Sequence, residues 1–271
     1  MTAPRIAALP MYDFPELTAA HDALWQQIAA RLAAAEVGSV PLTLSHELPY
    51  TEGWRHPGLL LGQACEYPLA KSPGTTVRVV ATPQYSAPGC DGARYCSVIV
   101  IRRDDAATTL ADLKGRRCAV NQRDSNSGMN LLRAAIAPLA NGAPFFGTVT
   151  VSGAHRESAR MVADARADVA ALDCVSFAHL ERCDRALTDA LRVVAWSPSS
   201  PSLPLITARA TDPATLHALR DALQSVAQDP ALAAVRARLF LRGFDFDHDG
   251  TFAEVLELEA SARALGYPVL A

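Results

Sequence analysis

The chain has 271 residues, half of them hydrophobic and a fifth charged, with a formal net charge of −3 at pH 7. This length suggests one large domain or two smaller ones, and the composition favours a packed core over disorder. The slightly acidic balance argues against a nucleic-acid partner, which needs a concentrated basic surface. No apolar run approaches the roughly 20 residues of a membrane-spanning helix.

The N-terminus and the cysteines bear on the compartment. The apolar segment Ile6–Leu9 stops at Pro10, so no signal peptide is recognised. The chain as written is expected to be cytoplasmic, or periplasmic if an export leader has been removed. Six cysteines without a CxxC pair predict neither a disulfide scaffold nor a zinc ribbon. Cys90 and Cys96 bracket a turn at Gly92, and two readings stay open: a disulfide between them, or two free thiols.

Apolar spacing predicts short strands that alternate with helices along the chain. The expected strands are Ile6–Pro10, Val40–Leu44, Gly58–Leu61, Val77–Ala81, Tyr95–Arg102, Cys118–Asn121, Thr148–Ser152, Val169–Leu172, Arg192–Trp196 and Leu205–Ala208. The expected helices are Glu16–Ala35, Ser127–Leu139, His155–Ala165, Asp173–Arg182, Pro213–Ala227, Leu232–Leu239 and Phe252–Leu265.

This alternation predicts an α/β fold built from parallel βαβ units. A weak internal repeat, in which 77–83 resembles 191–198, favours two lobes of similar topology. Pro/Gly/Ser-rich segments place the boundaries, with residues 1–100 and 203–271 in a discontinuous first lobe and 101–202 in the second. Each lobe is expected to hold a mostly parallel sheet flanked by helices. Two crossing strands would join the lobes, which would close like a hinge around a ligand in the cleft.

Three junctions between strand and helix in the second lobe carry polar residues. Ser125, Asn126 and Ser127 lie before the expected helix that starts near residue 127, where hydroxyls and backbone N–H groups form an anion site. His155 opens the next helix, and Asp173 opens the one after. Each could be a plain helix cap or a surface residue. Because the three strands are expected to be parallel, the three junctions are predicted to meet at one sheet edge.

Other motifs give weaker signals. Residues 245–250 imitate the start of a calcium loop, but Leu256 stands where the bidentate glutamate is required, so a turn is expected. His155, Ser158 and Asp173 could be drawn as a catalytic triad, yet no GxSxG motif occurs. The sequence therefore predicts no enzyme, no metal and no cofactor.

The order and spacing of several motifs resemble one known family. These motifs are Leu110–Asn121, Asp124–Gly128, Phe146–Gly147, Ser152–His155 and Ala167–Asp173. They are similar to those of the phosphate/phosphonate substrate-binding proteins of ABC importers, which have the type II periplasmic-binding-protein fold. The resemblance covers most of the chain and is densest from Leu110 to Pro198.

The resemblance implies roles for particular residues. In that family the polar loop that matches Ser125, Asn126 and Ser127 holds phosphonate oxygens. The family's histidine matches His155, and its acid, which contacts the ligand's amine in aminophosphonate binders, matches Asp173. First-lobe aromatics line the cleft. The candidates here are Tyr12, Tyr50 and Tyr85, together with Gln63 at the end of a first-lobe strand.

The expected function is capture of a small anionic solute, a phosphonate, phosphate or phosphate ester, for an ABC importer whose permease would be the partner. Two alternatives stay open. One is a cytoplasmic ligand sensor or binding protein of the same fold that is not coupled to transport. The other is a hydrolase.

Overall fold

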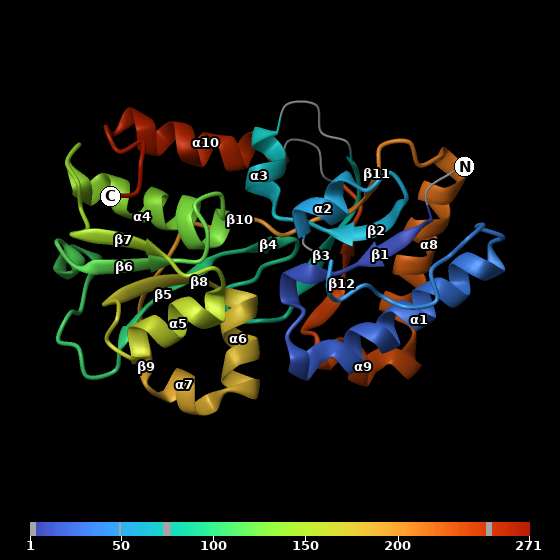
Figure 1. Ribbon diagram of the computed structural model, residues 1–271, viewed down its shortest axis with the longest axis horizontal. Helices are drawn as coiled ribbons and strands as arrows, with labels where there is room; N and C mark the ends of the chain where they lie inside the picture. Colours follow the sequence, from blue (N-terminus) through green and yellow to red (C-terminus); the bar gives the residue numbers. More distant parts are fainter. Residues whose placement is uncertain (1–3, 49, 73–76, 248–250) are drawn as a thin grey trace. The chain divides into compact units, whose positions relative to one another are not determined.

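The computed structural model describes residues 4–48, 50–72, 77–247 and 251–271. The chain divides into two compact units, which are coloured by sequence in Figure 1. Unit 1 comprises Met1–Ser86, Asp91–Ala93 and Ser202–Asp249, and unit 2 comprises Ala87–Cys90, Arg94–Pro201 and Gly250–Ala271. Within the described residues, no helix is long and apolar enough to cross a membrane.

Unit 1 contains a five-stranded sheet of order β1-β2-β11-β3-β12. Its strands are β1 (Ile6–Ala8), β2 (Leu59–Gln63), β3 (Val77–Tyr85), β11 (Leu205–Ala208) and β12 (Leu241–Asp245). The first two strands are parallel. The strand β11 runs antiparallel to both of its neighbours, and β12 runs antiparallel to β3.

The helices of unit 1 cover this sheet. They are α1 (Thr18–Ala34), α2 (Tyr50–Arg55), α3 (Glu66–Lys71), α8 (Pro213–Gln228) and α9 (Ala233–Arg238). The helix α8 packs on β3 and β12, α1 packs on α8 and α9, and α2 packs on β2 and β11. Apolar side chains of α1 that recur at helical spacing, among them Trp25, Ile28 and Leu32, are fully buried in this core.

Unit 2 contains a second five-stranded sheet, of order β7-β6-β8-β5-β9. Its strands are β5 (Ser97–Arg102), β6 (Arg117–Val120), β7 (Thr148–Val151), β8 (Val169–Asp173) and β9 (Leu191–Trp196). The strand β6 is parallel to both β7 and β8, whereas β5 is antiparallel to β8 and β9. Two short strands, β4 (Arg94–Tyr95) and β10 (Ser200–Pro201), pair separately.

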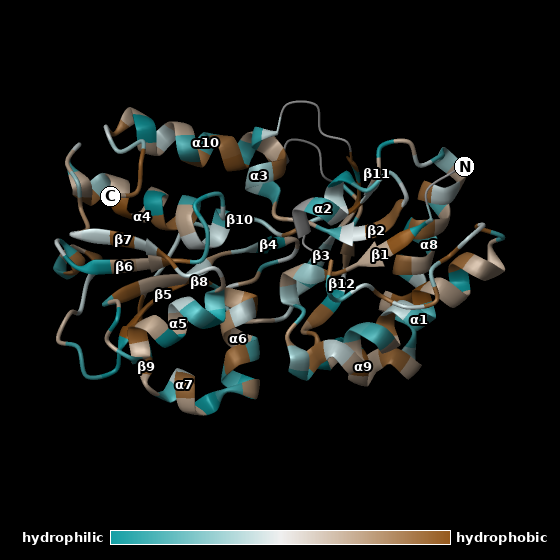
Figure 2. Cartoon of the chain, in the orientation of Figure 1, coloured by the Kyte–Doolittle hydropathy of each residue, from teal (hydrophilic) through white to brown (hydrophobic). Residues whose placement is uncertain are grey.

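Helices lie on both faces of the unit 2 sheet (Figure 1). They are η4 (Asn126–Leu131), α4 (Leu132–Ala140), α5 (His155–Ala163), α6 (Cys174–Cys183), α7 (Arg185–Asp189) and α10 (Thr251–Ala264). The helix α10 packs on α4 and η4, whereas α5 packs on α6 and α7. Burial on both faces explains the hydrophobic run of β5, which is brown in Figure 2.

The two sheets share one pairing pattern. In each sheet, two neighbouring parallel strands lie beside an antiparallel strand. On the other side of this antiparallel strand lies a fourth strand, which has the same direction as the first two. The order β1-β2-β11-β3 in unit 1 corresponds to β6-β8-β5-β9 in unit 2. Most strands of each sheet point the same way, but this antiparallel strand makes the hydrogen-bonded ladders mixed rather than mostly parallel.

The predicted lobe boundaries are wrong at two places. Residues 94–100 belong to unit 2, because β5 pairs with β8 and β9. The C-terminal segment from residue 250 also belongs to unit 2, since α10 packs on α4 and buries Val255 completely. The chain therefore passes between the units near 86–94, at 201/202 and again at 249/250, not twice.

The predicted strand Val40–Leu44 is also wrong, because these residues form no ladder. The segment is held by side chains instead: Leu44 is buried, and Trp25 Nε1 donates a hydrogen bond of 3.1 Å to the Pro41 carbonyl. Residues 248–250, at the end of the segment that imitates a calcium loop, lie outside the described residues. The strand β12 ends at Asp245, where that segment begins.

A candidate anion site in unit 2

Three parallel neighbours, β7, β6 and β8, end at one edge of the unit 2 sheet, and each leads toward a helix. The loop after β6 carries Ser125, Asn126 and Ser127. His155 starts the helix after β7, and Asp173 ends β8. The predicted meeting of the three junctions at one edge is therefore a feature of the fold. Helix N-termini at this edge favour negative charge there.

The helix after β6 begins with an unusual turn. Residues 126–131 form a π-helix, η4, which continues as α4. Ser125 is its N-cap, and its Oγ accepts a hydrogen bond of 3.0 Å from the Gly128 N–H. A Cβ at Gly128 would lie 1.9 Å from Asn121 Oδ1, so any other residue here would displace the Asn121 side chain. Such π-helical turns are frequent at functional sites.

Ser127 and His155 form the contact that joins two of the junctions. Ser127 Oγ lies 3.0 Å from His155 Nε2. Behind it, Ser97 Oγ donates a hydrogen bond of 2.8 Å to the Ser127 carbonyl and fixes the backbone. Burial lowers the pKa of His155 to about 4, and the backbone of Ala171 offsets this shift only in part. The imidazole is therefore neutral at pH 7.

Asn126 is fully buried and points into the protein. Its Nδ2 donates to Tyr95 Oη at 3.1 Å and to Ser200 Oγ at 2.8 Å, and its Oδ1 accepts from Asn130 Nδ2 at 2.9 Å. Asn130 Nδ2 also donates to the Val255 carbonyl of α10. This network places Asn126 as a support for η4. Its role as a ligand contact stays a prediction.

Asp173 is buried and caps α6. Its Oδ1 accepts hydrogen bonds of 2.8 Å from the Val175 N–H and 2.9 Å from the Ser176 N–H. The helix-cap reading therefore describes what this carboxylate does here. A role in binding a ligand's amine stays a prediction.

The first-lobe candidates gather within unit 1. Gln63 Nε2 donates hydrogen bonds to Tyr85 Oη at 3.0 Å and to the Leu203 carbonyl at 3.3 Å. The rings of Tyr12 and Tyr85 meet edge to face, 5.2 Å apart. All three side chains are buried. Tyr50 begins α2, and its side chain lies outside the described residues.

Several supporting residues were missed by the sequence analysis. Tyr95, Ser97 and Ser200 hold Asn126 and Ser127 in place, and Asn130 links Asn126 to α10. In the sequence, Tyr95 and Ser97 lie in a stretch that indicates only a strand, and Ser200 lies in a Ser/Pro segment that is typical of a domain boundary. The i, i+4 spacing of Asn126 and Asn130 is the one signal that could have paired two of these residues.

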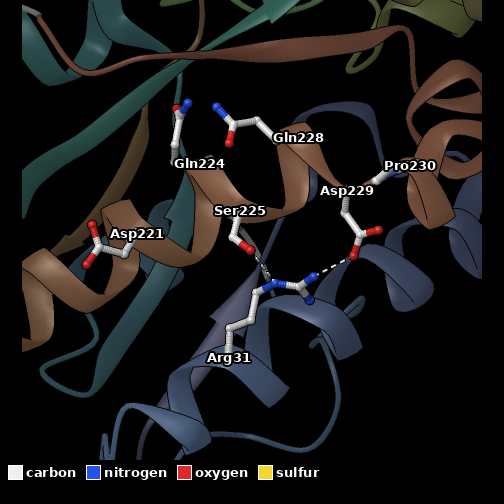
Figure 3. Close-up of a pocket in the computed structure, with 7 residues that line it drawn as sticks. All are labelled: Arg31, Asp221, Gln224, Ser225, Gln228, Asp229 and Pro230. Carbon is white, nitrogen blue, oxygen red and sulfur yellow. Dashed lines mark hydrogen bonds and ion pairs between the residues drawn. The ribbon is translucent and has the colours of Figure 1, made fainter.

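A surface pocket of about 430 Å³ lies elsewhere, between α1 and α8 of unit 1 (Figure 3). Arg31 is its one basic lining residue. Its Nε donates to Ser225 Oγ at 2.8 Å, and its Nη2 pairs with the Asp229 carboxylate at 2.6 Å. The cation is neutralised within the protein, so this pocket offers no anion site. No group of three or more histidine, cysteine or acidic side chains in the described residues could hold a metal.

Comparison with solved structures identifies the fold as that of periplasmic binding proteins of type II. A binding-protein component of an ABC phosphonate transporter from Pseudomonas aeruginosa superposes with a TM-score of 0.76 at 17% identity, over 97% of this chain and 88% of the other. PhnD1 from Prochlorococcus marinus, solved with methylphosphonate, gives 0.74 at 13% identity, over 96% and 99%. XAC2383 from Xanthomonas citri, solved with ATP, gives 0.70 at 17% identity, over 97% and 98%.

The sequence itself matches a family model over residues 61–249, described as the periplasmic substrate-binding protein of phosphonate ABC transporters. The chain belongs to this family, which confirms the family and the fold class predicted from the sequence. A search of curated proteins found no match.

Proposed function

We propose that this chain binds a small anion bearing a phosphonate or phosphate group, with the unit 2 residues Ser127 and His155 at the anion and with the first turn of η4 supplying backbone N–H groups. The hydrogen bond between Ser127 and His155 carries the proposal, because it brings two donor-capable side chains from separate junctions to one point. Family membership and the methylphosphonate named for the Prochlorococcus protein support the ligand class.

The proton on His155 would be linked to binding. With the proton of the neutral ring on Nδ1, Nε2 accepts the Ser127 hydroxyl proton. An arriving anion would compete for that hydroxyl. Protonation of Nε2 would then restore the hydrogen bond and add a positive charge beside the anion. Anion affinity should therefore rise as the pH falls below 7.

We propose binding without turnover. Among the described residues, His155 bonds to Ser127 and to no carboxylate, since Asp173 Oδ1 caps α6. Ser158, the nucleophile of the conceivable triad, hydrogen-bonds Ser152 Oγ at 2.7 Å instead. A nucleophile needs a base that a third group orients, and this arrangement does not supply one. In keeping with its family, the protein would deliver its ligand to an ABC permease.

The test is calorimetric titration with methylphosphonate, phosphate and methanesulfonate. Ser127→Ala should weaken binding of the anion that binds the wild type by about 10- to 150-fold, the equivalent of a lost charge-assisted hydrogen bond of about 1.5–3 kcal/mol. The matched control is Ser225→Ala on the exposed face of α8, which should leave affinity unchanged (Figure 3). Equal affinity of Ser127→Ala and wild type would remove Ser127 from the site.

The proton linkage has its own measurement. Methanesulfonate keeps one charge between pH 5 and 8, so any change in its affinity reports on the protein. We expect tighter binding at pH 5 than at pH 8 in the wild type, and no such change in His155→Gln. A flat wild-type profile would contradict the linkage while leaving anion binding itself intact.

A further inference from the structure

Three cysteines from separate segments meet in unit 2. Cys90 lies in the loop after β3, Cys96 lies between β4 and β5, and Cys174 is the first residue of α6. The Sγ atoms of Cys90 and Cys174 are 3.6 Å apart. The Cys96 thiol also lies next to that of Cys174. No disulfide joins any of the six cysteines in the structure.

The Cys90 loop is held against this cluster. Cys96 Sγ donates a hydrogen bond of 3.3 Å to the Gly89 carbonyl. Gly89 has a φ of +89°, and a Cβ there would come within 2.5 Å of the Trp196 ring and 2.8 Å of Cys96 Sγ. A glycine is therefore required for the loop to pack so closely. This packing brings Cys90 to Cys174, and the disulfide between Cys90 and Cys96 that the sequence left open is not formed in the structure.

The three thiols differ in access. Cys174 and Cys96 are buried, with exposed fractions of 1% and 6%, whereas Cys90 is only half-buried. The Cys174 thiol and burial raise the pKa of Cys96. The Cys90 thiol and burial raise the pKa of Cys174, and Cys96 offsets this shift only in part. An oxidant from solution therefore meets Cys90 first, with Cys174 waiting directly behind it.

We propose that Cys90 and Cys174 are a redox-active pair that a small disulfide of the oxidised-glutathione type converts into a protein disulfide. The Cys90 thiolate attacks one sulfur of the small disulfide, which forms a mixed disulfide and releases one small thiol. Cys174 then loses its proton to solvent, attacks Cys90 Sγ and displaces the second small thiol. Two protein thiols are oxidised and one small disulfide is reduced to two thiols.

A disulfide between Cys90 and Cys174 would restrict the motion of the loop at residues 87–90, where the chain passes between the two units. The two sulfurs must approach from 3.6 Å to about 2.0 Å, and the loop is the softer partner because Cys174 belongs to a buried helix. The bond ties the loop at residues 87–90 to the start of α6. It lies next to Asp173, yet the inference does not depend on anion binding.

The experiment incubates the full chain with oxidised glutathione at pH 8, counts thiols under denaturing conditions and maps cross-linked peptides by mass spectrometry. We expect two of the six thiols to disappear and one cross-link, Cys90 to Cys174, to form. The bond should be absent from Cys90→Ser. It should persist in Cys96→Ser, which keeps a donor to Gly89, and in the control Cys183→Ser.

Three results would overturn the proposal: six remaining thiols, a stable mixed disulfide at Cys90 without a cross-link, or a cross-link between Cys90 and Cys96. Mapping of the wild-type peptides decides among these even if a variant folds poorly. Hydrogen exchange of residues 87–93 should also slow in the oxidised protein. Unchanged exchange in a protein that carries the bond would contradict the restraint on the loop.

Discussion

In unit 1 the segment after β1 carries Tyr12, whereas in unit 2 the segment after the corresponding strand, β6, carries Ser125, Asn126 and Ser127. The next pair of corresponding strands ends in Gln63 in unit 1 and in Asp173 in unit 2. The shared pairing pattern thus presents aromatic and amide groups in one unit and hydroxyl and carboxylate groups in the other. The backbone pattern sets the positions of these residues, and the side chains alone set the chemistry.

The two clusters also differ in how they satisfy their polar groups. In unit 1, Gln63 and Tyr85 are hydrogen-bonded to each other, and the ring of Tyr85 meets that of Tyr12 edge to face. In unit 2, Asn126 is hydrogen-bonded to three side chains within the core, whereas Ser127 pairs with His155, which is partly exposed. A buried network that is fully satisfied fixes a unique geometry, so it can hold a small polar pair in place.

The largest expected effect comes from breaking that network. Asn126→Ala leaves the hydrogen-bonding groups of Tyr95, Ser200 and Asn130 buried without this partner, so the free energy of unfolding should fall by about 3 kcal/mol. Chemical denaturation measures it. Gln224→Ala, an exposed amide on α8, should change stability by less than about 0.5 kcal/mol (Figure 3). A similar small change for Asn126→Ala would show that the network does not hold η4.

The sequence predicted most of the strands and helices and the junctions at Ser127, His155 and Asp173, because hydrophobic period and cap residues are local signals. It missed the strand β12 and placed a strand at Val40–Leu44 that does not form. It could not assign α10 to unit 2, since helical periodicity shows that a face is buried but not which sheet buries it. Nor could it show that Asn126 points inward. That direction depends on the π-helical turn and on Tyr95 and Ser200, which are distant in sequence.

Two histidines, His155 in unit 2 and His46 in unit 1, have pKa values that are shifted in opposite directions. The larger effect on stability is expected from His155. Because burial lowers its pKa to about 4 from an ordinary value near 6.5, the unfolded chain binds more protons between these values. Stability should therefore fall by up to about 3 kcal/mol as the pH drops from 6.5 to 4.

Denaturation of the wild type and of His155→Gln across this pH range isolates the contribution of the imidazole. We expect the variant to lose less stability than the wild type on acidification, by up to about 3 kcal/mol. The difference between the two proteins cancels the titration of other groups. Parallel pH profiles would show that His155 is solvated well enough to protonate in the folded state at its ordinary pKa.

The smallest expected effect concerns His46 in unit 1, which shifts the other way. His46 Nδ1 lies 2.6 Å from the Asp13 carboxylate, and its Nε2 lies 3.0 Å from Asp22. His21 faces the other oxygen of Asp13 at 3.5 Å. Burial alone would lower the pKa of His46, but the hydrogen bonds to both carboxylates outweigh it and raise the pKa. Burial alone would raise the pKa of Asp13, but the contacts with His21 and His46 outweigh burial and lower this pKa.

A raised pKa means that the folded protein holds the His46 proton more tightly than the unfolded chain. The stabilisation is complete below about pH 6.5 and is lost as the pH rises through the raised value.

Because the His46 side chain is 28% exposed and that of Asp22 39%, screening limits the effect to about 0.5–1 kcal/mol. We expect the wild type to lose this amount relative to His46→Gln between pH 6 and pH 9, measured by chemical denaturation at both values. The matched control is Gln224→Ala, which changes an exposed residue of α8 without removing a titratable group, and it should respond to pH as the wild type does. An equal pH response in wild type and His46→Gln would mean that the contacts with Asp13 and Asp22 do not bind the proton more tightly in the folded state. The contrast between the two histidines would then rest on the burial of His155 alone.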